Sequence, residues 1–150
     1  MQSELLNPLA ESSRIEKMPD PCTMVIFGAS GDLTKRKLIP AIFDLARQGV
    51  LPSGFTIVGA GRTAMSHEVF REYMFKALKE FGRFQESEKA LWETFVRGLF
   101  YVTIDPGKPE EYAKLKKELE VINEARRAGE NVLFYLSTPP GMYSPIIKGL

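Results

Sequence analysis

The sequence predicts an α/β fold in which a parallel sheet carries helices on both faces. Three observations support this fold class. Short apolar segments alternate with longer amphipathic segments along almost the whole chain. Few polar residues interrupt the apolar segments, as is typical of parallel strands that are buried on both faces. A segment of helical length separates successive strands, so the connections are expected to be right-handed crossovers.

The first three elements can be placed from their apolar runs and from the residues that interrupt them. A strand is expected over 23–27, where apolar and β-branched residues follow one another. A helix is expected over about 33–48, because Gly49 follows it in a position that commonly ends a helix. Pro40 lies inside this helix and lacks an N–H group, so it predicts a kink or a two-step start. A second strand is expected over 55–59.

The later elements continue the alternation. Ser66 is a favourable N-cap for the next helix, in which apolar residues recur at helical spacing as far as Phe81. The remaining elements are expected in this order: a helix over 87–97, a strand over 99–104, a helix opened by Pro109 and ended by Gly129, a strand over 132–136, and a helix from Met142 onward.

Composition excludes several functional classes. The net charge of +1 gives no overall field that would attract nucleic acid or an anionic membrane. Cys22 is the only cysteine, which excludes an intramolecular disulfide and a multi-cysteine metal cluster, and no metal site is expected. No apolar stretch reaches the roughly 18–20 residues that span a bilayer. Residues 1–21 are expected to form a polar arm that does not resemble a signal peptide, so we expect a cytoplasmic domain over 22–150.

The segment between the first strand and its helix is the most informative about function. It reads VIFGASGDLTKRKLIPA and places Gly28 and Gly31 at the start of the helix. Unpaired N–H groups and the positive end of the helix dipole meet at such a turn, which makes it a site for an anion. A glycine-rich turn also occurs without any ligand, and the spacing here is G-x-x-G-x-x-T. Its place after the first strand favours a dinucleotide held by a Rossmann-type doubly wound parallel sheet.

Each residue of this turn has an expected role. Gly28 permits the sharp turn, and Gly31 lets the backbone approach a pyrophosphate. Thr34 is expected to pack the helix against the sheet, and Lys35 to add positive charge near the phosphates. Asp32 would repel an anion, so it is expected to cap or orient backbone N–H groups instead. The candidate coenzyme-binding residues of the turn are Gly28, Ala29, Ser30, Gly31, Asp32, Leu33, Thr34 and Lys35.

The end of the second strand indicates which coenzyme is bound. Domains that bind NAD place a carboxylate there for the adenosine ribose hydroxyls. This chain has no acid at that point, and Arg62 supplies a planar cation suited to a 2′-phosphate. The hydroxyl of Ser30 could bind the same phosphate. The sequence therefore predicts NADP; a solvated surface role for Arg62 and dual use of NAD remain the alternatives.

Two other patterns could suggest a catalytic site. Tyr112 and Lys116 match the Tyr-x-x-x-Lys pair of short-chain dehydrogenases, but Tyr112 also belongs to the apolar stripe of its own helix. We expect it to pack in the core. His67 lies beside the Ser66 N-cap, where a capping or solvent-exposed role is expected.

The segments VIFGASGDLTKRKLIPAIFDL, IVGAGR and FYLSTPPGMY together resemble the coenzyme domain of the glucose-6-phosphate dehydrogenase family. The resemblance extends from about Thr23 to Leu150. It implies that the glycine turn wraps the NADP phosphates and that Arg62 takes the 2′-phosphate. It also implies that Tyr143, after the double proline, lines the coenzyme pocket.

The resemblance further implies NADP-dependent oxidation of glucose 6-phosphate to 6-phosphoglucono-lactone, the entry step of the oxidative pentose phosphate pathway. The family's histidine base, its aspartate partner and its Glu-Lys-Pro segment would fall beyond Leu150. The chain is therefore expected to be a truncated amino-terminal coenzyme domain with no catalytic residue, inactive alone, and part of a homo-oligomer when full-length. A short-chain NADP reductase and a non-catalytic NADP-sensing module are the alternative functions.

Overall fold

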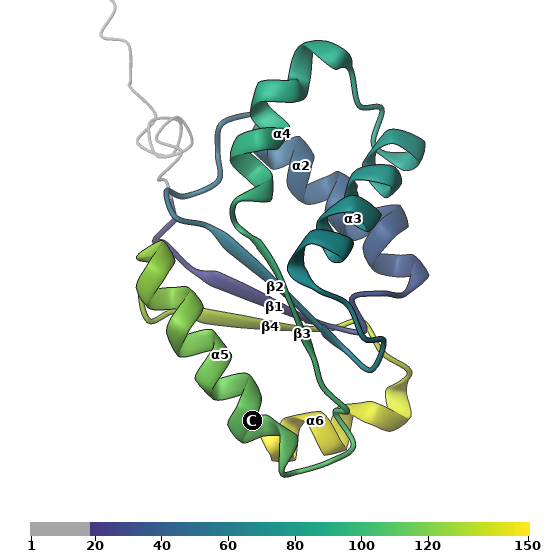
Figure 1. Ribbon diagram of the computed structural model, residues 1–150, viewed down its shortest axis with the longest axis vertical. Helices are drawn as coiled ribbons and strands as arrows, with labels where there is room; N and C mark the ends of the chain where they lie inside the picture. Colours follow the sequence, from purple (N-terminus) through teal and green to yellow (C-terminus); the bar gives the residue numbers. More distant parts are fainter. Residues whose placement is uncertain (1–18) are drawn as a thin grey trace, which may run out of the picture.

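A four-stranded parallel sheet forms the centre of the computed structural model, which describes residues 19–150. Its strands are β1 (Thr23–Phe27), β2 (Thr56–Gly61), β3 (Leu99–Thr103) and β4 (Val132–Leu136). Their order across the sheet is β3-β2-β1-β4 (Figure 1). The chain moves to one side from β1 and then returns past it to β4. The carboxyl ends of β1 and β4 therefore flank the switch point at which open α/β sheets bind ligands.

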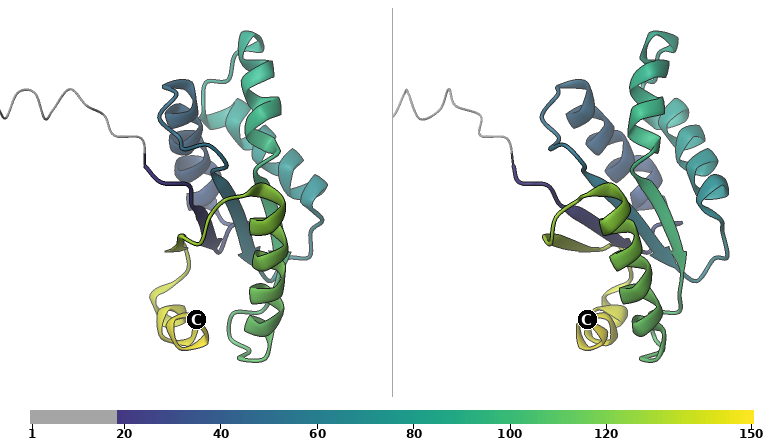
Figure 2. Two further views of the ribbon diagram at one scale, coloured as in Figure 1. Left: turned by 90° about the vertical axis from the view of Figure 1, so that its left-hand side faces the viewer. Right: turned by 60° about the vertical axis from the view of Figure 1, so that its left-hand side comes forward.

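The helices form one layer on each face of the sheet. Helices α2, α3 and α4 cover one face, and α5 and α6 cover the other (Figures 1 and 2). The helical elements are η1 (Thr34–Leu38), α2 (Ile39–Arg47), α3 (His67–Phe81), η2 (Glu86–Glu88), α4 (Lys89–Val96), α5 (Glu111–Arg126), η3 (Pro140–Met142) and α6 (Tyr143–Gly149). The predicted α/β class and parallel sheet are confirmed. The arm predicted for 1–21 lies outside the described residues up to position 18.

The first helix has the two-step start that Pro40 predicts. Its opening turn, η1, is a π-helix in which the N–H of Ile39 donates to the carbonyl of Thr34, five residues earlier. Pro40 then sits buried in the first turn of α2. Proline has no N–H to donate, and its ring crowds the carbonyl four residues before it. A widened turn ahead of the proline relieves this crowding, since π-turns lengthen the hydrogen-bonded loop.

Several predicted element ends differ from those in the structure, and two of these differences have a clear cause. β2 continues to Gly61, because Gly59 and Gly61 still pair with β3. A Cβ atom at Gly59 would lie 2.7 Å from the ring of Phe70, so glycine lets α3 pack directly on the strand. The second difference is at the end of α5, which stops at Arg126 rather than near Gly129. Arg127 adopts the left-handed conformation, with φ 53°, that ends the helix.

The predicted helix over 87–97 is divided in two in the structure. It begins as the 3₁₀ turn η2 and continues as α4. Glu88 joins the two segments to α2, because its carboxylate pairs with the guanidinium of Arg47. The same guanidinium donates to the carbonyl of Gly82 at 2.9 Å, at the end of α3. Arg47 therefore ties three helices of one layer together. Within residues 19–150, no helix has the length and hydropathy needed to cross a membrane.

Candidate functional site

The glycine turn directly follows β1 at the carboxyl edge of the sheet. The N–H of Gly28 donates to the carbonyl of Ala60 at 2.9 Å, and the N–H of Gly31 donates to the carbonyl of Gly28 at 3.0 Å. Gly28 has φ 76°, and a Cβ atom there would lie 2.1 Å from the carbonyl oxygen of Ser137, just after β4. Only glycine fits this position. The turn is therefore held between the ends of β2 and β4.

Several backbone N–H groups of the turn have no acceptor within the described part of the chain. The N–H of Lys35 donates to the carbonyl of Gly31 at 3.4 Å, which begins the helical ladder. The unpaired donors ahead of it are the N–H groups of Ser30, Asp32, Leu33 and Thr34. These are the orphan donors that open a helix, and the positive end of the helix dipole lies with them. The turn is thus built to receive an anion.

The charged side chains of the turn pair with one another. Asp32 lies 3.4 Å from the Nζ atom of Lys35 and 3.7 Å from the Nε atom of Arg36. Its carboxylate makes no hydrogen bond to a backbone N–H among residues 19–150, so the predicted capping role is wrong. The hydrogen bond to Asp32, followed by the influence of Tyr73, raises the pKa of Lys35. Lys35 therefore stays charged beside the turn at neutral pH.

Two tyrosines fix the backbone on either side of the candidate site. The hydroxyl of Tyr73, on α3, donates to the carbonyl of Ser30 at 3.2 Å. The hydroxyl of Tyr101, on β3, donates to the carbonyl of Thr63 at 2.7 Å, and burial raises its pKa to about 12. The hydroxyls of Ser30 and Thr63 lie 3.4 Å apart. The loop after β2 is thereby held against the glycine turn.

Arg62 belongs to this loop, between Gly61 and the anchored Thr63. Its side chain is exposed and forms no ion pair or hydrogen bond with any described residue. The structure thus brings the backbone of Arg62 beside Ser30 and leaves its guanidinium available. Four cavities of 280–410 Å³ are all lined by residues outside the turn, which lies at an open edge of the sheet.

Two buried hydroxyls near this edge lack partners. The Oγ1 atoms of Thr34 and Thr138 have no hydrogen-bond partner among the described residues. Thr34 is fully buried, in agreement with its predicted packing role. The Cγ2 atom of Thr138 lies 3.1 Å from the place that a Cβ of Gly28 would occupy. An unsatisfied buried hydroxyl is unfavourable, so a ligand with polar atoms fits this edge.

The remaining predicted site residues are placed in different environments. Ala29 is fully buried, with its methyl group 2.8 Å from the Cβ position of Gly59, so only its backbone borders the turn. Leu33 is exposed at the start of the helix. Tyr143 is 41% exposed at the start of α6 and makes no hydrogen bond with the glycine turn within residues 19–150. The structure therefore brings together the turn and the Arg62 loop, and the coenzyme contact of Tyr143 stays a prediction.

Tyr112 is a core residue, as its apolar stripe predicts. It is 8% exposed, and its hydroxyl donates to the carbonyl of Pro106 at 2.7 Å. Burial, followed by the charge of Asp105, raises its pKa. A catalytic tyrosine base needs a lowered pKa and access to substrate. The Tyr-x-x-x-Lys match is therefore not a short-chain dehydrogenase site.

His67 has a structural role that the sequence did not indicate. Its Nδ1 atom accepts a hydrogen bond of 3.0 Å from the N–H of Tyr101, on the outer side of β3. Arg71 donates to the carbonyl of Leu99, and Lys114 to that of Thr103, on the same strand. These three side chains satisfy backbone groups of an edge strand, which would otherwise be available for pairing.

The chain is similar to known proteins over almost all of its described length. The family model described as "Glucose-6-phosphate dehydrogenase, NAD binding domain" matches residues 25–150. The glucose-6-phosphate 1-dehydrogenase of Chlamydia muridarum is 42% identical over 130 residues, covering 87% of this chain and 26% of the relative. The enzyme of Treponema pallidum is 38% identical over 126 residues, covering 84% of this chain and 24% of the relative. The chain thus spans about a quarter of the length of these relatives.

Solved structures agree with this similarity. A glucose-6-phosphate dehydrogenase in complex with its substrate glucose-6-phosphate superposes with a TM-score of 0.76 at 31% identity, covering 89% of this chain and 27% of that one. A glucose-6-phosphate 1-dehydrogenase from Mycobacterium avium superposes with a TM-score of 0.73 at 23% identity, covering 88% of this chain and 26% of that one. At this identity the similarity shows a shared fold only.

Proposed function

Because the chain belongs to the glucose-6-phosphate dehydrogenase family, in which it forms the domain that binds a nicotinamide coenzyme, we propose that this coenzyme is NADP. We further propose that the protein oxidises glucose 6-phosphate to 6-phosphoglucono-lactone. The observation that carries the proposal is the group of N–H donors at the glycine turn, with the guanidinium of Arg62 on the adjoining loop, none of which has a partner within residues 19–150. The coenzyme supplies a nicotinamide ring that accepts a hydride.

The turn suits a pyrophosphate in both shape and charge. Gly28 lets the chain turn sharply beside β4, and Gly31 carries no side chain, so a ligand can approach its backbone closely. The N–H groups of Ser30, Asp32, Leu33 and Thr34 would donate to phosphate oxygens. Lys35 would add a charge that its raised pKa keeps in place. The hydroxyl of Thr138, which has no partner among the described residues, would offer a further hydrogen bond.

The loop after β2 supports NADP rather than NAD. Ala60, Gly61, Arg62 and Thr63 include no acid that could accept hydrogen bonds from ribose hydroxyls. A guanidinium donates to phosphate in a bidentate manner and remains charged at every physiological pH. The hydroxyls of Ser30 and Thr63 lie next to the same loop. All of these groups complement a phosphate on the ribose 2′ oxygen.

Replacing Arg62 with alanine should weaken NADPH binding by about 1.5–3 kcal/mol, the scale of a hydrogen bond to a charged group. This corresponds to roughly a 10- to 150-fold higher Kd. Binding of NADH should hardly change, since it lacks the 2′-phosphate. Fluorescence titration of the chain with both coenzymes measures the effect, and Arg97→Ala, which changes an exposed arginine directly after α4, is the matched control. An equal loss of affinity for NADPH and for NADH would refute the role assigned to Arg62.

The reaction can be tested in a chimera. Residues 25–150 would replace the matching segment of the Chlamydia muridarum glucose-6-phosphate 1-dehydrogenase, to which this chain is 42% identical. We expect NADP-dependent oxidation of glucose 6-phosphate. In the chimera, Arg62→Ala should raise the KM for NADP about tenfold or more and leave the KM for glucose 6-phosphate unchanged. A folded chimera that binds NADPH but reduces no NADP would contradict the proposed reaction.

A further inference from the structure

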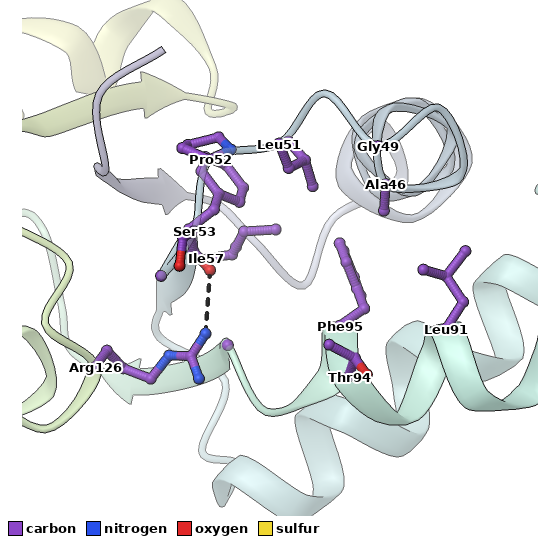
Figure 3. Close-up of a pocket in the computed structure, with 13 residues that line it drawn as sticks. Ala46, Gly49, Leu51, Pro52, Ser53, Ile57, Leu91, Thr94, Phe95 and Arg126 are labelled. Atoms are coloured by element: carbon purple, nitrogen blue, oxygen red, sulfur yellow. Dashed lines mark hydrogen bonds between the residues drawn. The ribbon is translucent and has the colours of Figure 1, made fainter. Parts of the chain in front are cut away.

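A cavity of about 290 Å³ lies at the opposite edge of the sheet from the glycine turn, where β2 begins. It is enclosed by the end of α2, the loop after it, α4 and the last turn of α5 (Figure 3). Its apolar walls include Leu51, Phe55, Ile57, Leu91 and Phe95. Among residues 19–150, Arg126 is the only charged residue that lines it. We propose that this cavity binds a small apolar carboxylate, with Arg126 as the group that recognises its charge.

The bonding of Arg126 leaves room for an anionic partner. Its Nε atom lies 3.3 Å from the hydroxyl of Thr56, and its Nη2 atom lies 3.5 Å from the carbonyl of Phe55. Both acceptors are neutral and both contacts are long. No described carboxylate forms an ion pair with Arg126. A guanidinium carries five N–H donors, so most of them remain available to a ligand.

The backbone just before β3 makes space for the guanidinium of Arg126. A Cβ atom at Gly98, just before β3, would lie 3.0 Å from the Nη2 atom of Arg126. Glycine therefore lets the side chain reach across the start of the sheet to the cavity wall (Figure 3). Arg126 is half-buried there. A charge that is partly removed from water is stabilised strongly by an opposite charge, and a carboxylate matches the planar fork of the guanidinium.

The dimensions and walls of the cavity define the rest of the ligand. Its volume is near the lower end of the range for small-molecule sites, about 300–1,000 Å³. Leu51 and Leu91 face each other across it in Figure 3, with Phe95 between them. These side chains favour a short alkyl chain or a single ring. Octanoate has this chemistry, and octanamide is its neutral counterpart of almost the same shape.

The test is an NMR titration of the chain with octanoate, following the methyl groups of Leu51 and Leu91 and the Nε–H of Arg126. We expect saturable shifts at these groups. Arg126→Ala should raise the Kd about tenfold or more, and octanamide should bind the unaltered chain about tenfold or more weakly, as expected on loss of a charged hydrogen bond. Arg97→Ala, which changes an exposed arginine beside the cavity, should leave the affinity unchanged.

A second variant keeps the proposal testable if Arg126→Ala does not fold. Thr94 lines the cavity but is exposed on α4, so Thr94→Trp should fill the space without disturbing the core. Octanoate binding should then be lost. Equal affinities for octanoate and octanamide, shifts confined to the glycine turn, or unchanged binding in Thr94→Trp would each overturn the proposal. The inference stands apart from the proposed function, because NADPH titration of the same variants reports on the other edge of the sheet.

Discussion

Replacing Gly28 with alanine should destabilise the domain by about 3 kcal/mol or more. A residue with a Cβ atom is strained by about 1–2 kcal/mol in the left-handed conformation, and Gly28 has φ 76°. The added atom would also lie 2.1 Å from the carbonyl oxygen of Ser137. Displacing a packed backbone costs a further 1–3 kcal/mol or so. Urea denaturation monitored by circular dichroism measures the free energy of unfolding.

Gly49 provides the matched control for this substitution. It has φ 68°, and a Cβ atom there would meet nothing within 4 Å. Gly49→Ala should therefore cost only the conformational strain, about 1–2 kcal/mol. The difference between the free energies of unfolding of the two variants measures the cost of the contact between residue 28 and the chain just after β4. If both variants lost the same stability, the contact between Gly28 and Ser137 would not constrain the turn.

Replacing Phe43 with alanine should cost about 3–5 kcal/mol, as is typical of a large aromatic side chain removed from a core. Phe43 is fully buried on α2. Its ring packs edge-on against that of Phe95, with 5.4 Å between the ring centroids. The rings of Trp92 and Phe84 lie tilted beside it, each with its centroid 6.2 Å away. The substitution opens a cavity that these aromatic rings cannot close. Trp92, the only tryptophan, gives a fluorescence signal for urea denaturation.

Leu45→Ala is the comparison within the same helix. Leu45 is 41% exposed, so its truncation should change the free energy of unfolding by about 0.5 kcal/mol or less. If Leu45→Ala lowered the free energy of unfolding strongly and Phe43→Ala lowered it only slightly, α2 would have to pack against the sheet through its opposite face.

The elements that were predicted well are those whose signal is local. β1 and β4 occur at 23–27 and 132–136, as predicted, because their apolar runs are continuous and flanked by breakers. Ser66 caps α3 by accepting a hydrogen bond from the N–H of Val69 at 3.2 Å. The glycine turn was predicted because strand, turn and helix follow one another directly in the chain. These features depend on neighbours in sequence, which the sequence displays.

The parts that were missed depend on contacts between distant elements. Tyr73 and Tyr101 hold the two sides of the site, but each belongs to an apolar pattern that indicates only burial. Thr138 could have been suggested by its position after β4, beside β1, once the strand order was known. The role of His67 arises from its bond to β3, whose edge position only the sheet order reveals. Asp32 pairs with nearby cations rather than with the backbone.

The most direct test of the coenzyme site is to follow the backbone amides of the chain while NADPH is added. We predict that the largest shifts occur at Ser30, Asp32, Leu33 and Thr34, whose N–H groups lack acceptors within the described residues, and at Arg62 on the adjoining loop. Saturable binding with its largest shifts at another edge of the sheet, or no shift at the glycine turn with NADPH in excess, would contradict the account.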